Sequence, residues 1–174
     1  EDDHIHVLKL TDVMVAFTRS ANPVPDHVVS IIDIIRNFAD GLHHAKEENL
    51  LFPKLGEKGF SPYQGPVAVM LHEHTEGRNF VKGIVDNLSL YKGGEKDALK
   101  DINKYMLAYA TLLENHIAKE NNMLFRMADN LLSNDEQSEL LSQFEKEENN
   151  AKSGKKPEDY ISAINSLAVI YLKD

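Results

Sequence analysis

HHAKEENLLF, residues 43–52, is repeated in this chain as HIAKENNMLF, residues 116–125. Each copy follows an acid–histidine pair that stands about forty residues earlier, Asp-His at positions 3–4 and Glu-His at positions 73–74. Both the histidine-rich segments and the pairs lie in stretches with the apolar period of a helix. The sequence therefore predicts a doubled helical hairpin.

The positions that the two copies share carry side chains that bind metals. His43 and Glu47 of the first copy match His116 and Glu120 of the second. Residues four apart lie on one face of an α-helix, about 6 Å apart along its axis, so they can direct an imidazole and a carboxylate at one point. Each copy therefore has the spacing of a metal site.

Four long stretches have a helical apolar period and end at helix-breaking residues. The predicted helices cover about residues 3–19, 26–52, 64–91 and 95–131. Such a set predicts an all-α fold, an up-down four-helix bundle, and we expect the second helix to stop at Pro53. We expect the bundle over residues 1–132, and a C-terminal helical extension over residues 133–174 that packs on the bundle or on a partner chain.

The phase of each histidine against the apolar stripe of its own helix separates core positions from surface positions. In the second predicted helix, His43 and Glu47 continue the line of Val28, Ile32 and Ile35. The residues that lie on such lines in the four helices are His4, His43, Glu47, His74, His116 and Glu120. Buried carboxylates without partners are strongly destabilising, and a cation between them relieves this cost. We therefore predict that these six residues bind metal.

The alternative is a hydrogen-bonded His/Glu network without metal, but such a network would not require the same spacing in both halves. The chain has no cysteine, which excludes thiolate sites, so only nitrogen and oxygen ligands remain. This donor set suits iron or manganese, with zinc as a further option. The symmetry favours two ions, bridged by Glu47 and Glu120.

Three further residues are additional candidate ligands. His44 lies one residue off the core line, so it is either a ligand or a group that touches one. His72 and Glu73 flank the predicted ligand of the third helix, and a solvated position is expected for His72. Glu73 and Asp3 either hydrogen-bond a ligand ring or are plain solvated acids. Glu48 is expected to face solvent.

The formal net charge of −9 argues against nucleic acid or an anionic membrane surface as the main partner. A small ligand is easier to accommodate. The N-terminal segment is acidic where a secretory signal would be basic, and no apolar run is long enough to span a bilayer. We therefore expect a cytoplasmic protein, either alone or as a homodimer.

With these motifs in hand, the chain resembles the hemerythrin-like HHE cation-binding family of bacteria and archaea, in its stand-alone form. HHAKEENLLFP, MLHEHTEGR and HIAKENNMLF carry the resemblance, which covers about residues 2–132. It implies a four-helix bundle that holds a non-haem di-iron centre, with the six residues above as ligands. Two departures stand out. Hemerythrins proper have a histidine where this chain has Met70, and an aspartate five residues after the last histidine, where this chain has Glu120 four residues after His116.

The number of ligands bears on function. Two six-coordinate irons offer about twelve positions, of which four histidines, two bridging carboxylates and a bridging oxygen (oxo or hydroxo) leave about two open. About one stays open if His44 or His72 also binds iron. We expect a protein that binds or senses a small diatomic ligand, dioxygen or nitric oxide. The alternatives are an oxidoreductase that reduces peroxide or oxygen, with Tyr105 or Tyr109 as electron donors or as packing residues, and an iron-handling or repair protein.

Overall fold

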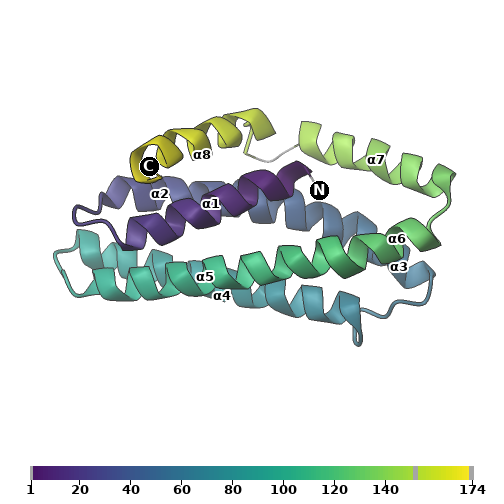
Figure 1. Cartoon of the computed structure of the whole chain (residues 1–174), viewed down its shortest axis with the longest axis horizontal. Helices are drawn as coiled ribbons and strands as arrows, with labels where there is room; N and C mark the ends of the chain where they lie inside the picture. Colours follow the sequence, from purple (N-terminus) through teal and green to yellow (C-terminus); the bar gives the residue numbers. More distant parts are fainter. Residues whose placement is uncertain (1, 151–152, 173–174) are drawn as a thin grey trace.

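The computed structural model describes residues 2–150 and 153–172, and all regular elements within them are helical. In chain order they are α1 (Asp2–Thr18), α2 (Pro25–Ile34), η1 (Ile35–His44), η2 (Glu47–Leu51), α3 (Phe52–Glu57), α4 (Pro66–Lys92), α5 (Ala98–Lys119), η3 (Glu120–Leu124), α6 (Phe125–Leu131), α7 (Asn134–Asn149) and α8 (Pro157–Tyr171). The predicted all-α bundle is confirmed (Figure 1). None of the helices in the described residues is long and apolar enough to cross a membrane.

The bundle consists of four rods: α1, the continuous helix from α2 to α3, α4, and the continuous helix from α5 to α6 (Figure 1). Helices α4 and α5 pack against each other most extensively, and α1 also packs on α5. Their buried faces form two apolar clusters, one including Leu42 and Ile117 and the other including Leu51 and Leu124. The histidine-rich segments join these residues in the chain, so the polar centre lies between two apolar layers.

The second rod does not stop at Pro53, and that prediction is wrong. The helix continues to Glu57 as α3. Just before the proline the backbone is π-helical, and the Phe52 N–H donates to the carbonyl of Glu47, five residues back. Because the hydrogen-bond ladder has already shifted at this point, the missing N–H and bulky ring of a proline interrupt it less than they would in a regular α-helix.

The π-helical segment η1 (Ile35–His44) changes which side chains face the core. A π-turn holds more residues than an α-turn, so neighbouring residues are separated by a smaller rotation. His43 and His44 are consequently both buried, with 6% and 5% of their surface exposed. The α-helical phase that placed His44 off the core line does not apply here.

Gly41 permits this wider turn. A Cβ at this position would stand 2.7 Å from the carbonyl oxygen of Arg36. We expect Gly41→Ala to lower the free energy of unfolding of the metal-free protein by about 1–3 kcal/mol, because the backbone must shift to relieve the overlap. Urea unfolding measures this loss. Gly56→Ala is the matched control, since Gly56 is also helical but a Cβ there meets nothing within 4 Å. A loss no larger than that of the control would contradict the steric role of Gly41.

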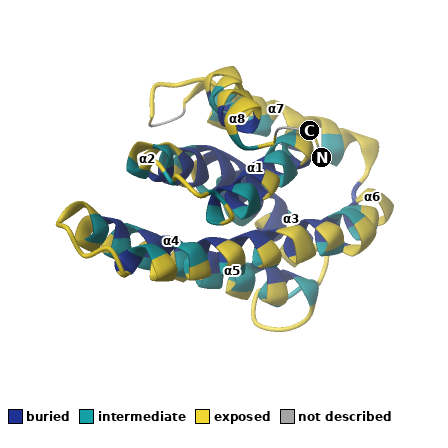
Figure 2. Ribbon diagram, turned by 60° about the vertical axis from the view of Figure 1, so that its left-hand side comes forward, coloured by how far each residue is buried: buried dark blue, intermediate teal, exposed yellow. Residues whose placement is uncertain are grey.

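The C-terminal helices α7 and α8 lie along one side of the bundle (Figure 1). Helix α8 buries Tyr160, Ile164 and Leu167 in the same apolar cluster as α1 and α2. Helix α7 buries only Leu140 and begins with a capping box between Ser133 and Glu136. Figure 2 shows the difference, because α7 is mostly exposed or half-buried. Within the described residues, therefore, α8 packs on its own bundle.

Candidate metal centre

The six predicted ligands converge between the two apolar layers. His4 comes from α1, His43 and Glu47 from the second rod, His74 from α4, and His116 and Glu120 from the fourth rod; all six are at most 6% exposed. The histidines form two pairs. The Nε2 atoms of His4 and His43 are 3.0 Å apart, and those of His74 and His116 are 3.1 Å apart.

Each glutamate turns one oxygen to each histidine pair. Oε1 of Glu120 lies 2.9 Å from Nε2 of His116, and Oε2 lies 3.2 Å from Nε2 of His4. Glu47 does the same, with Oε1 3.8 Å from Nε2 of His43 and Oε2 3.4 Å from Nε2 of His74. Both carboxylates therefore span the gap between the two pairs.

These distances fit two six-coordinate ions. Adjacent ligands of an octahedral ion with bonds of about 2.1 Å stand about 3.0 Å apart, which is the separation within each histidine pair. All four oxygens of Glu47 and Glu120 are buried and lack a well-directed hydrogen bond within the chain. Buried carboxylate oxygens without donors are costly unless a cation binds them. Both observations match a metal centre.

Their surroundings shift the pKa values of the two carboxyl groups in opposite directions. Burial raises the pKa of Glu47 well above its usual value, and the nearby charge of Glu120 adds to this effect. Burial also opposes ionisation of Glu120, but the adjacent imidazoles of His116, His4 and His43 outweigh it and lower the pKa of this carboxyl well below its usual value. Without a cation, Glu47 therefore holds a proton more readily than Glu120, and a cation between the two carboxylates would compete with that proton.

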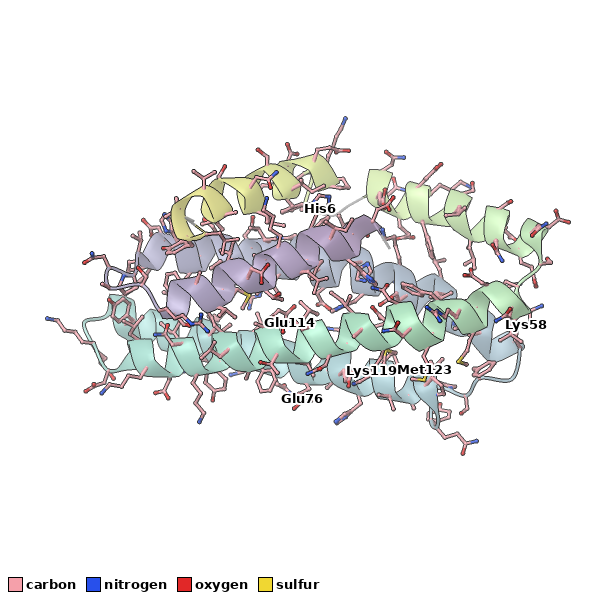
Figure 3. All side chains as sticks on the ribbon, viewed as in Figure 1. His6, Lys58, Glu76, Glu114, Lys119 and Met123 are labelled. Carbon is pink, nitrogen blue, oxygen red and sulfur yellow. The ribbon has the colours of Figure 1, made fainter. Side chains whose placement is uncertain are left out.

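The outer nitrogens of two ligand rings bind the acids of the acid–histidine pairs. Nδ1 of His43 donates to Asp3 at 3.3 Å, and Nδ1 of His116 donates to Glu73 at 2.9 Å. Glu73 also accepts from Lys119, which is labelled in Figure 3. Such hydrogen bonds fix the tautomer that leaves Nε2 free for metal. Of the two alternatives for Asp3 and Glu73, the structure therefore has the one in which each acid hydrogen-bonds the ring of a predicted ligand.

The other two ligand rings are oriented by a second pair of equivalent positions. Nδ1 of His74 donates to Glu48 at 2.7 Å, and Nδ1 of His4 donates to Asn121 at 2.8 Å. Glu48 was predicted to face solvent because its counterpart in the repeat is Asn121, and that prediction is wrong. An amide oxygen accepts a hydrogen bond from an imidazole as a carboxylate does, so the replacement keeps this function. The register of the repeat could have indicated both residues.

The three additional candidates have different positions. His72 is exposed and lies outside the cluster. Glu73 contacts His116 and Lys119 rather than the cluster centre. His44 is buried, stacks on the ring of His74 with centroids 3.9 Å apart, and groups with His74 and His116.

A salt-bridge chain connects the centre to α7. Lys46 is 8% exposed and donates to Asp3 at 2.8 Å and to Glu148 at 2.6 Å. Asp3 in turn holds His43. The bridge thus ties α7 to a predicted ligand, and nothing in the spacing of the sequence indicated Glu148.

We expect Lys46→Met to lower the free energy of unfolding by about 1–3 kcal/mol, since it leaves the partly buried Asp3 without its cation. The control is Lys82→Met, which breaks the exposed pair between Lys82 and Asp86 and should change stability by less than about 0.5 kcal/mol. Chemical denaturation of both variants provides the comparison. Equal effects would show that the buried position of Lys46 has no special weight.

A cavity of about 180 Å³ reaches the centre from the side of His44 and His74, and Tyr109 and Val81 form part of its wall. Arg78 and Asp40 also line this cavity. The guanidinium of Arg78 donates to Asp40 at 2.9 Å and to Glu48 at 2.8 Å, and these acids hold the rings of His44 and His74. Arg78 therefore fixes the hydrogen-bond partners of two buried histidines.

Comparison with known proteins agrees with this geometry. The family model described as the hemerythrin HHE cation-binding domain matches residues 1–128. Uncharacterised proteins of Mycobacterium bovis and Mycobacterium tuberculosis are 27% identical over 115 residues, which is 66% of this chain and 44% of theirs. The chain thus spans less than half the length of these curated relatives. No solved structure matches the chain significantly.

Proposed function

Because the chain belongs to the hemerythrin HHE cation-binding domain family, we propose that it is a di-iron protein that binds or senses a small diatomic ligand, dioxygen or nitric oxide. The proposed ligands are His4, His43, Glu47, His74, His116 and Glu120. His4 and His43 would hold one ion, and His74 and His116 the other. When bound, such an iron pair supplies a redox-active centre with affinity for dioxygen and related ligands.

One observation carries the proposal: each of two buried carboxylates faces both histidine pairs. A single ion would need only one pair and would leave the second pair and half of each carboxylate unused. Two ions use every inward-facing atom of the six residues. This pattern, with a glutamate and a histidine one turn apart on facing helices, is that of carboxylate-bridged metal pairs in helical bundles.

The donor set favours iron. Imidazoles together with hard carboxylate oxygens suit iron and manganese, and the absence of thiolates disfavours structural zinc. Two phenylalanine rings also shield part of the centre from water. Phe125 stacks on His4 with centroids 5.4 Å apart, and Phe52 stacks on His74 at 5.8 Å. Apolar walls exclude water and favour an uncharged diatomic ligand over a hydrated ion.

Iron stoichiometry together with optical spectra tests the proposal. The protein is loaded with Fe(II) without oxygen, measured by elemental analysis, exposed to air and then placed under vacuum. We expect two irons per chain and an oxygenated spectrum that reverts under vacuum. Irreversible oxidation followed by turnover of peroxide would replace the proposal with the oxidoreductase alternative. Irons that pass readily to a chelator or an acceptor protein would favour iron handling, and a single zinc would exclude the di-iron centre.

A further inference from the structure

We propose that Glu148 of α7 is a positioning residue of the centre and that it acts, through Lys46, on the proposed ligand His43. This proposal rests on the proposed di-iron function and deepens it, because it makes the two ions of the pair unequal. Helix α7 begins at Asn134, after the last residue that the family model matches. The inference therefore concerns a segment outside the matched domain.

Three contacts connect Glu148 to the ring of His43. Nζ of Lys46 donates to Oε1 of Glu148 at 2.6 Å and to Oδ2 of Asp3 at 2.8 Å. The same Oδ2 atom accepts the Nδ1–H of His43 at 3.3 Å. Lys46 and His43 therefore compete for one oxygen of Asp3, and Lys46 has the shorter contact.

Glu148 divides the positive charge of Lys46 between two carboxylates. The ammonium then neutralises Asp3 less completely than it would alone. A more negative Asp3 accepts a stronger hydrogen bond from His43 and makes this ring a more basic ligand. The side chains of Lys46, Asp3 and Glu148 are 10%, 24% and 34% exposed, so solvent screens this coupling only in part.

The repeat provides an internal comparison. Lys119 is the counterpart of Lys46, and it donates to Glu73, which holds the ring of His116. Within the described residues, Lys119 pairs with no second acid, and its side chain is 37% exposed. The two equivalent contacts therefore differ by one acid, and that acid comes from α7.

Helix α7 also supports the neighbour of His4, the other proposed ligand of the same ion. Leu140 and Phe144 of α7 pack in one apolar cluster with Phe125, whose ring stacks on His4 with centroids 5.4 Å apart. Nζ of Lys46 lies 5.9 Å from the centroid of the Phe144 ring, which favours the position of the ammonium beside α7. Both proposed ligands of one ion thus have neighbours that α7 contacts.

Proton NMR of the metal-free protein tests the effect of Glu148 on His43, because a stronger hydrogen bond moves the Nδ1 proton to lower field. Glu148→Gln should move the His43 signal upfield, since Lys46 then neutralises Asp3 more completely. Lys46→Met should move the same signal downfield, since Asp3 loses its cation. A general loosening of α7 would instead move the signal in the same direction in both variants.

The iron-loaded protein provides a second readout. The reduction potential should rise in Glu148→Gln and fall in Lys46→Met, because a more basic imidazole favours the more highly charged iron. Mössbauer spectra of Glu148→Gln should change for one iron of the pair and not for the other. Equal changes at both irons would contradict an effect that acts through His43.

Glu145→Gln is the matched control, because Glu145 is an exposed acid of the same helix and has no ion pair within the described residues. It should behave as wild-type protein, and Glu148→Asp, which keeps the charge, should stay closer to wild type than Glu148→Gln. An unchanged His43 signal in Glu148→Gln would overturn the proposal. If Lys46→Met fails to fold, as judged by circular dichroism, the comparison of Glu148→Gln with Glu148→Asp decides. Fewer than two irons in wild-type protein would contradict the di-iron function, whereas the NMR test needs no metal.

Discussion

Under the proposed di-iron assignment, Glu120→Ala is expected to reduce the iron content from two ions per chain to at most one. Glu120 is fully buried, and its two oxygens lie within 3.2 Å of Nε2 atoms from both histidine pairs. In the proposed centre, alanine would remove one ligand from each ion and one of the two bridges between them. Elemental analysis after desalting measures the effect, and Glu47→Ala should have the same direction.

Two control variants test whether the loss of iron is specific to Glu120. Glu114, labelled in Figure 3, is an exposed residue of the same helix, and Glu114→Ala should keep both irons. Glu48→Gln keeps a hydrogen-bond acceptor for His74 but changes its charge, so both irons should stay, with affinity reduced by up to about 10–100-fold. Two irons per chain in Glu120→Ala would contradict the bridging assignment.

Removing the metal is expected to destabilise the folded chain strongly. A ligand that binds only the folded state adds about 4 kcal/mol of stability when its free concentration is a thousand times its Kd. The metal-free chain must also keep two facing carboxylates buried. Anaerobic denaturation of the loaded and chelator-treated protein should therefore show a shift of at least this size. A smaller shift would mean that the site is formed without metal at little cost.

Glu47→Gln should reverse part of this behaviour. The variant binds metal poorly, but its metal-free form should be more stable than the wild-type metal-free form at neutral pH. The sign follows from the raised pKa of Glu47. A carboxyl that binds its proton more tightly when folded stabilises the chain below its unfolded pKa, and this contribution is lost as pH rises through the folded pKa. The difference between variant and wild type should therefore grow from acidic to neutral pH. A constant difference would contradict the raised pKa.

The amino-acid sequence alone determined the all-α class, the repeat and the six residues that converge in the centre. These conclusions were available because a helix places residues four apart on one face, whatever surrounds it. His43 with Glu47 and His116 with Glu120 needed no tertiary information to be paired. The acids before His4 and His74 were also visible, although their function as partners of His43 and His116 required the packing of helices.

The tertiary structure decided the rest. The inward position of His44 and the passage of the helix through Pro53 both depend on π-helical turns, which shift the phase that α-helical periodicity assumes. Such turns are rare insertions within α-helices, so the regular apolar period gave no sign of them. The link from Lys46 to Glu148 joins residues 102 positions apart and arises only when α7 lies against the bundle. Sequence periodicity indicates which side chains share one face of a single helix. Which side chains of different helices contact one another depends on how those helices pack.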